Sequence, residues 1–311
     1  MSDTPQTLPA SSSQPAPPSP RRRPAPPTAR PSSREEGSQP LPDPAGISLA
    51  ELLDVQQTDR DRFRADVVFD EPYDLYGGQV AAQALVAAGR TVPEGRAPHS
   101  LHAYFLRAGS ADRPTEFRVE RDRDGRSYSA RRVVALQDDR IVFSVAASFH
   151  AAEEGRDQQV SALPDVPSPN GLPPTTIPRL ASFEARQLPQ PDPQASWPSR
   201  IWARCTADLG DDPLLHAGVL TYLSDMFTGL VSLRDQDFLP MSSLDHAVWF
   251  HRPARLDDWV LLDLVPHTVA HGRGWYTGTV SSPDGVLRAS LTQEQLFRRH
   301  QAPKRLEPGT T

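Results

Sequence analysis

The chain has one cysteine, Cys205, among its 311 residues. A single thiol provides neither an intramolecular disulfide nor a cluster of thiolate ligands for a metal. The chain also has no apolar run long enough to cross a bilayer, and no apolar stretch follows its N-terminal charges as a secretion signal requires. We therefore expect a cytoplasmic protein without a membrane span.

The common sequence motifs of enzymes are also missing. There is no GxSxG nucleophile elbow, no Walker loop, no GxGxxG dinucleotide motif and no HExxH zinc motif. The nine histidines show no ligand spacing, and nothing around Cys205 suggests a base that would activate its thiol. We expect neither a metal nor a cofactor.

Proline is concentrated at the N-terminus, where the first 46 residues hold 13 of the 34 prolines. This stretch also has runs of serine and arginine, and no apolar pattern from which a core would form. We predict that 1–46 is a disordered tail. The rest of the chain is acidic, which argues against a nucleic-acid partner.

Two stretches of the chain repeat one pattern. Residues 100–107 (SLHAYFLR) correspond to 243–252 (SLDHAVWFHR), and the arginines that end them, Arg107 and Arg252, lie 145 positions apart. Ile141 and Val286 correspond at the same offset, with strand-like sequence between the anchors in both copies. A shared offset predicts a duplicated α+β unit.

Local patterns predict the elements of each unit. The alanine-rich stretch 77–89 ends at a glycine, and Asp212-Pro213 is an N-cap with a following proline, so long helices are expected over 77–89 and 214–227. A capping box predicts a short helix over 48–53. Alternating apolar residues predict strands over 62–69, 99–106, 116–123, 127–137, 140–149, 200–206, 243–250, 259–265, 274–281 and 286–298.

These elements divide the chain into two similar units. We predict an N-terminal unit over 47–151, a proline-rich linker over 152–180, a C-terminal unit over 181–300 and a C-terminal tail over 301–311. Each unit has one long helix and a run of antiparallel strands in the same order. A sheet that curls around a buried helix satisfies this pattern.

Two polar residues interrupt apolar surroundings in the second unit. Asp225 lies in a predicted helix that is otherwise apolar, where a carboxylate is costly to desolvate without partners. Gln293 continues the apolar row of the last strand, and a buried amide needs partners for its donors and its acceptor. Each is as consistent with a satisfied structural residue as with a site residue. Ser243, two residues before Asp245, is an ordinary serine by itself.

The chain from about Leu52 to Arg299 resembles the acyl-CoA thioesterase II family. The stretches that carry the resemblance are 75–80 (LYGGQV), 99–107 (HSLHAYFLR), 124–133 (DGRSYSARRV), 222–225 (YLSD), 244–253 (LDHAVWFHRP) and 293–294 (QE). It implies an α+β double hotdog, in which two tandem hotdog units form a continuous antiparallel sheet around two long helices. It also implies hydrolysis of acyl-CoA to a free fatty acid and CoA by water attack, without a covalent intermediate.

The family's catalytic residues are an aspartate in the second-unit helix, a serine or threonine just before the Leu-Asp-His stretch, and a glutamine in the final strand. These positions fall on Asp225, Ser243 and Gln293, which we name the trio; the neighbouring Ser242 is a second candidate for the hydroxyl. Asp225 is expected to accept a proton from water, and the other two to hold that water. We expect no metal, cofactor or acyl-enzyme.

The first unit has Gln79 and Ser148 near the equivalent places but no aspartate in its helix, so one active site per chain is expected. Two alternatives to hydrolysis are open. A hotdog enoyl-CoA hydratase usually pairs an aspartate with a histidine, and no histidine replaces Gln293. A noncatalytic acyl-CoA-binding module has no need for a polar cluster on an apolar surface. The resemblance also implies a homo-oligomer, either a dimer or a tetramer.

Overall fold

The computed structural model describes residues 47–66, 74–177, 182–189, 199–226, 229–235 and 237–299. The predicted tails, 1–46 and 301–311, lie outside these residues, as do parts of the predicted strand 62–69 and of the predicted linker 152–180. All described residues belong to one compact unit of the chain. Within the described ranges, none of the helices has the length and hydropathy of a membrane span.

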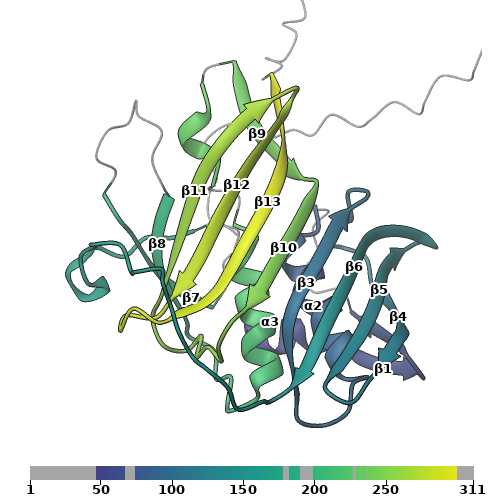
Figure 1. Cartoon of the computed structure of the whole chain (residues 1–311). Coiled ribbons are helices and arrows are strands. Elements are labelled where there is room, and N and C mark those ends of the chain that lie inside the picture. The colour runs from purple at the N-terminus through teal and green to yellow at the C-terminus, as the bar shows by residue number, and fades with distance from the viewer. Residues whose placement is uncertain are drawn as a thin grey trace, which may run out of the picture. The chain divides into compact units, whose positions relative to one another are not determined.

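The described part of the first half forms two helices and six strands (Figure 1). In chain order these are α1 (Leu49–Leu53), β1 (Gln56–Asp59), β2 (Arg62–Ala65), α2 (Gly77–Gly89), β3 (Arg96–Phe105), β4 (Thr115–Asp124), β5 (Tyr128–Gln137) and β6 (Arg140–Ala151). The predicted capping box at Ser48 and Glu51 is present. Strand β1 was missed because all four of its residues are exposed and none is apolar.

The described part of the second half contains one α-helix and seven strands. These are β7 (Phe183–Gln187), β8 (Ser199–Cys205), α3 (Pro213–Ser224), β9 (Phe238–Ser243), β10 (Asp245–Phe250), β11 (Val260–Ala270), β12 (Arg273–Ser281) and β13 (Leu287–Arg299), with short 3-10 turns η1 (Pro169–Gly171) and η2 (Val231–Leu233). The sequence did not indicate β7. The prediction that α3 continues through Asp225 and Met226 is wrong, because the helix ends at Ser224.

The strand predicted over 243–250 is also wrong in one respect, because it is divided at Leu244 into β9 and β10. Both strands pair with β13 in succession, but the register shifts by one residue between them: Ala247 lies opposite Thr292, whereas Ser243 lies opposite Gln295. Leu244 donates its N–H to the Glu294 carbonyl at 2.8 Å. This is a β-bulge, which changes the face to which the following side chains point.

The described strands form one antiparallel sheet. Counted inward from each edge, the strands of the two halves follow the same order along the chain. The order is β1-β2-β4-β5-β6-β3-β10-β13-β12-β11-β8-β7, with β9 alongside β13. Strands β3 and β10 meet in the middle, and each is followed outward by the matching strands of its own half. The antiparallel sheet expected from the sequence is confirmed.

Individual contacts repeat across the middle of the sheet. His102 and Ala247, which correspond at the 145-residue offset, lie directly opposite each other between β3 and β10. Arg107 donates from Nη1 to the Ile141 carbonyl at 2.7 Å, and Arg252 donates from Nη1 to the Leu287 carbonyl at 2.9 Å. A pseudo-twofold axis through the β3–β10 ladder relates the paired residues of these two strands. The two arginine contacts repeat to within one residue, since Ile141 and Leu287 lie 146 positions apart.

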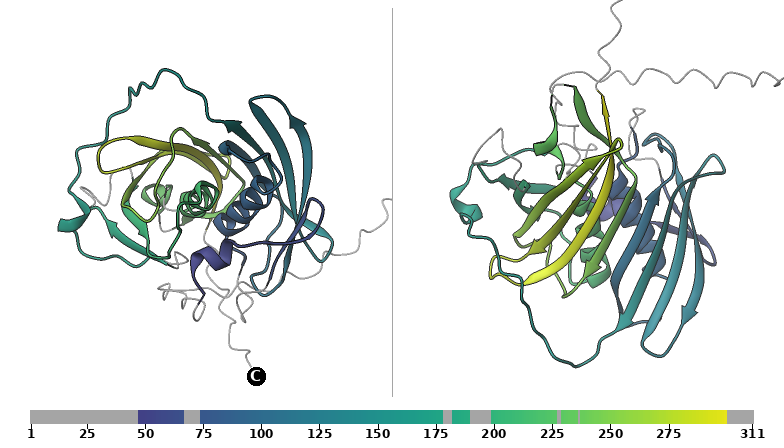
Figure 2. Two further views of the ribbon diagram at one scale, coloured as in Figure 1. Left: turned by 90° about the horizontal axis from the view of Figure 1, so that it is seen from below. Right: turned by 45° about the horizontal axis from the view of Figure 1, so that its top comes forward.

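Helices α2 and α3 pack side by side and antiparallel on the concave face of the sheet (Figure 2). At one end, the Tyr76 hydroxyl donates to the Tyr222 carbonyl at 2.9 Å, and a Cβ added to Gly78 would overlap that carbonyl. At the other end, Gly89 packs against Leu214. Glycine at both crossings lets the two backbones approach closely, and the N-terminus of α2 lies beside the C-terminus of α3.

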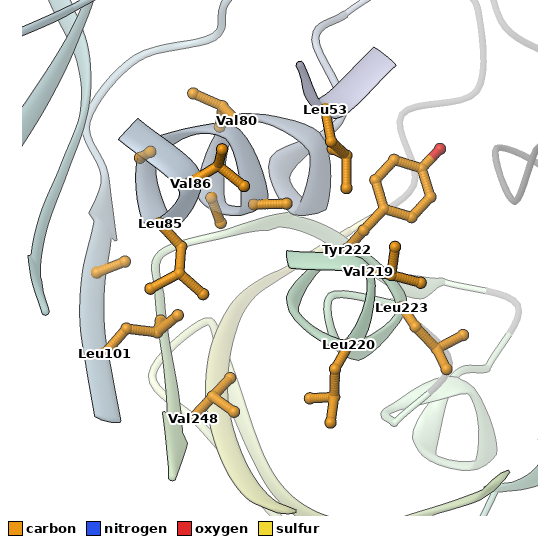
Figure 3. Close-up of a cluster of buried hydrophobic side chains, with 14 of the residues drawn as sticks. Leu53, Val80, Leu85, Val86, Leu101, Val219, Leu220, Tyr222, Leu223 and Val248 are labelled. Carbon is orange, nitrogen blue, oxygen red and sulfur yellow. The ribbon is translucent and has the colours of Figure 1, made fainter. Parts of the chain in front are cut away.

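Apolar side chains from both helices and both central strands form one core (Figure 3). Leu85 and Val86 of α2 and Val219 and Leu220 of α3 are buried there, together with Leu101 and Val248 of the sheet. Every residue of α2 from position 78 to 88 is buried. The small alanine side chains of α2 therefore allow a helix to be enclosed on nearly every side.

Replacing Gly78 with alanine should destabilise the fold. Alanine in a helix normally favours folding over glycine by about 1 kcal/mol. Here the added Cβ meets the Tyr222 carbonyl and the Tyr76 ring, so we expect a net loss of about 1–3 kcal/mol, as in other overpacked cores. Denaturant unfolding measures this loss. Gly171→Ala is the control because a Cβ there meets no atom, and equal stability of the two variants would contradict the close approach.

Candidate active site

The trio predicted from the sequence comes together at one point, although its members lie on three different elements. Gln293 donates from Nε2 to Asp225 Oδ1 at 2.8 Å and to Ser243 Oγ at 2.5 Å, and Ser243 Oγ donates to Asp225 Oδ1 at 3.3 Å. Asp225 is 3 % exposed and Gln293 is 0 % exposed. The arrangement is a nearly dry carboxylate that receives two side-chain hydrogen bonds.

Asp225 is positioned by the end of α3. It is the C-cap residue, with φ −85° and ψ 22°, so its side chain leaves the helix axis instead of lying on a helix face. Because α3 is antiparallel to α2, the carboxylate lies against Gly77, where an added Cβ would overlap Oδ2. The positive end of the α2 dipole favours a negative charge at this place. Glycine at position 77 leaves the room that the carboxylate occupies.

Ser243 is positioned by the bulge at Leu244. In β13 the odd-numbered residues from 289 to 297 face the core, and Ser243 lies opposite one of them, Gln295. Without the one-residue shift, Ser243 would lie opposite Leu296 and point to the other face. The Asp245 carboxylate helps to hold the bulge by accepting the Glu294 N–H at 2.8 Å, and burial raises the pKa of Asp245. The bulge therefore selects Ser243 rather than Ser242 as the hydroxyl of the trio.

Gln293 lies on β13, next to Asp225 and Ser243. Its neighbour on the adjacent strand β12 is Tyr276, which is fully buried and donates its hydroxyl to the Met226 carbonyl at 3.3 Å. Burial, and then the nearby charges of Asp225 and Asp245, raise the pKa of Tyr276 well above its ordinary value. The phenol therefore stays neutral beside the carboxylate.

A cavity of about 580 Å³ opens in front of Asp225 and Ser243. Apolar side chains from both halves of the chain form much of its lining: Val80, Phe105, Leu106, Val142 and Phe143 from the first half, and Pro240, Met241, Leu244 and Leu296 from the second. The polar side chains of the lining also come from both halves: Asp74, Tyr76 and Arg107 from the first, and Asp225, Ser242 and Ser243 from the second. The cavity therefore lies where the two halves meet, and a few polar groups are set in a lining that is otherwise apolar. This is the usual composition of a small-molecule site.

The corresponding residues of the first half do not form a second trio. Ser148 bonds His99 Nε2 at 2.8 Å, and no hydrogen bond joins it to Gln79 within the described residues. Cys205 is buried, and burial raises the pKa of its thiol to about 11, so it is not poised as a nucleophile. Among the described residues, no three His, Cys, Asp or Glu side chains are grouped as metal ligands.

Two buried residues beside the trio were not singled out from the sequence. His246 is 1 % exposed, and its Nε2 lies 2.8 Å from the Ser224 hydroxyl. Gln295 is buried two residues beyond Gln293, and neither atom of its amide has a partner in the described part of the chain. Only their alternation with outward-facing residues marks them in the sequence, and apolar core residues share that pattern.

Known proteins resemble the chain over most of its length. Residues 71–150 match the family described as "Acyl-CoA thioesterase N-terminal domain", and 157–297 match "Acyl-CoA thioesterase C-terminal domain". Acyl-coenzyme A thioesterase 8 from Homo sapiens is 32% identical, over 82% of this chain and 92% of that protein.

Two solved structures share the fold. An acyl-CoA thioesterase II from Mycobacterium marinum aligns with a TM-score of 0.71 and 37% identity, over 81% of this chain and 98% of that one. An Alicyclobacillus acidocaldarius protein described as having a hot dog fold aligns at a TM-score of 0.66 and 22% identity, over 81% and 97%. The fold is therefore of the hotdog type. The chain belongs to the acyl-CoA thioesterase II family.

The two buried glutamines of β13 provide a matched pair for a stability measurement. Gln295→Met should raise the free energy of unfolding by about 1–3 kcal/mol, because an unpaired buried amide is removed without loss of volume. Gln293→Met should lower it, because the hydrogen bonds to Asp225 and Ser243 are lost. Denaturant titration of both variants checks the difference in sign. A destabilised Gln295→Met would show that this amide is satisfied in solution.

Proposed function

We propose that the protein hydrolyses acyl-CoA thioesters to a free fatty acid and CoA, and that the trio carries out the reaction. One observation carries the assignment: a nearly dry carboxylate, Asp225, receives two side-chain hydrogen bonds and borders a cavity lined largely by apolar side chains. Membership of the acyl-CoA thioesterase II family supports the same reaction.

Asp225 acts as the general base. A water molecule held by its carboxylate and by the Ser243 hydroxyl oxygen attacks the thioester carbonyl carbon, and Asp225 takes the proton. The tetrahedral intermediate then collapses, the C–S bond breaks, and the proton passes from Asp225 to the departing CoA sulfur. Gln293 fixes the carboxylate and the hydroxyl relative to each other, so the water is held in one orientation. No bond forms between the protein and the acyl group.

The first turn of α2 is the donor that we assign to the developing oxyanion. Gly77 lines the cavity beside Asp225, and the first N–H groups of a helix have no carbonyl partner within that helix. Tyr76, the N-cap residue, provides no side-chain cap. An oxyanion at this end of α2 also meets the positive end of the helix dipole. The acyl chain lies along the apolar lining of the cavity, past Val80 and Phe143.

The chain is a double hotdog with one active site in this proposal. The strand order, which is the same from either edge, and the pseudo-twofold axis support two tandem units around α2 and α3. The offset of 145 residues relates Gln293 to Ser148, and the C-cap residues of the two helices are Asp225 and Arg90. The first unit therefore lacks the base. The unit boundaries and the cytoplasmic location expected from the sequence stay predictions.

Substitutions in the trio test the mechanism. Asp225→Asn keeps the size of the side chain but removes the base, so acyl-CoA hydrolysis should fall by roughly 10²–10⁴-fold. We expect losses in the order Asp225→Asn ≥ Gln293→Ala > Ser243→Ala, because only the aspartate takes a proton. Release of free CoA from a series of acyl chain lengths measures each rate.

Asp212→Asn is the matched control for these substitutions. Asp212 caps the other end of α3, and asparagine is an equally good N-cap, so both stability and turnover should be retained. A folded Asp225→Asn protein with the wild-type rate would make the aspartate structural. Binding of acyl-CoA without thiol release would favour the noncatalytic module, and hydration of enoyl-CoA would favour the hydratase.

We also propose that the chain associates into a homo-oligomer through the outer face of its sheet. Three large aromatic side chains are exposed there, on β3, β10 and β12: Tyr104 (62 %), Trp249 (37 %) and Trp275 (38 %). Aromatic side chains are enriched at protein interfaces.

Light scattering at micromolar concentration should therefore give at least twice the chain mass of 34.2 kDa. Trp249→Lys should lower the measured mass, because it places a charge in the proposed contact. Val160→Lys is the control, since Val160 is exposed outside the sheet. A wild-type protein with the mass of one chain would contradict the association.

A further inference from the structure

His246 is buried on β10 directly beside the trio. Ala247 pairs with Thr292 in the β10–β13 ladder, and His246 and Gln293 are the next residues on the two strands. Both side chains are buried. Its Nε2 lies 2.8 Å from Ser224 Oγ, at the last residue of α3, and Asp225 is the next residue. His246 therefore contacts the element that presents the base and faces the amide that orients it.

The amide of Gln293 has one orientation that satisfies the trio. Both hydrogens of its Nε2 are used, one toward Asp225 Oδ1 and one toward Ser243 Oγ. Its Oε1 therefore points away from the carboxylate. If the amide rotated by half a turn, two oxygens would face each other and the pair of hydrogen bonds would be lost. A hydrogen-bond donor on the side of the amide away from Asp225 is needed to favour this orientation of Oε1.

Two buried atoms lie without a partner on that other side. Neither Gln293 Oε1 nor His246 Nδ1 has a hydrogen-bond partner within the described residues. The two side chains are nevertheless close enough for Gln293 to raise the pKa of His246. Burial has the larger effect and lowers this pKa to about 4. The imidazole is therefore neutral near pH 7 and carries one N–H.

We propose that His246 is a positioning residue for the reaction, which acts as the Nδ1–H tautomer. In this form Nδ1–H donates to Gln293 Oε1, and the bare Nε2 accepts the hydroxyl hydrogen of Ser224, which is then no longer donated to the Thr221 carbonyl 2.9 Å from Ser224 Oγ. The opposite tautomer would turn a lone pair toward Oε1 and release the amide to rotate. This inference rests on the proposed role of Gln293 in holding the catalytic water.

A second buried histidine provides a contrast within the same half of the chain. His216 on α3 donates from Nε2 to the Gly210 carbonyl at 3.1 Å, and its Nδ1 accepts the Leu256 N–H at 3.2 Å. Backbone groups thus fix His216 as the Nε2–H tautomer. Its hydrogen bonds within the described residues do not involve the trio, so it separates the effect of a buried histidine from that of the proposed position.

Kinetics test the positioning role. His246→Leu removes the donor, and kcat should fall by about 10²-fold with little change in KM, since the water is misplaced while the cavity is intact. His246→Asn places an amide N–H near the position of Nδ1 and should recover most of kcat. His216→Leu and His216→Asn should lower stability and leave kcat unchanged. Thermal unfolding identifies any variant that does not fold.

The tautomer itself is tested without turnover. Long-range ¹H–¹⁵N correlation of histidine-labelled protein at pH 7 should show Nδ1–H for His246 and Nε2–H for His216, with His246→Asn and His216→Asn assigning the signals. An Nε2–H tautomer at His246, or equal kcat losses in His246→Leu and His246→Asn, would overturn the proposal. Wild-type rates in Asp225→Asn and Gln293→Ala would instead overturn the proposed function, whatever the tautomer.

Discussion

One constraint shapes the site: the buried carboxylate of Asp225 needs hydrogen-bond donors around it. Asp225 is almost fully removed from water, and a charge in that position is tolerated only when dipoles surround it. Ser243 of β9 and Gln293 of β13 donate hydrogen bonds to it, and Gly77 at the start of α2 lies against it. The antiparallel packing of the two helices, the glycines between them and the bulge at Leu244 are each required to bring the donors to one point.

Features of the fold that depend on residues close together in the sequence were predictable. Alanine content and a terminal glycine define α2, a capping box defines α1, and the shared offset of 145 residues predicted that two halves use one pattern. The resemblance to a known family then identified Asp225, Ser243 and Gln293 as a group. Their proximity in space agrees with that grouping, although periodicity alone left each of them equally consistent with a structural role.

The features that sequence reasoning missed arise from tertiary contacts. A single strand over 243–250 would have placed Ser243 and His246 on opposite faces, and only pairing with β13 reveals the one-residue shift that reverses Ser243. The local sequence does not predict the end of α3 at Ser224 either, because apolar residues continue beyond it. His246 was not predicted as a site residue, because a histidine on a strand is expected to be exposed unless its burial is known.

The order of the strands also determines which strands lie at the edges of the sheet. A sheet that is not closed into a barrel has two edges, and here they are β1 and β7. Strand β1 is four exposed polar residues, and β7 carries the charged pair Glu184 and Arg186, while Thr175 pairs with Ala185 along its free side. Short, charged or covered edges resist the addition of further strands. The described edges of the sheet are thus protected against edge-to-edge aggregation.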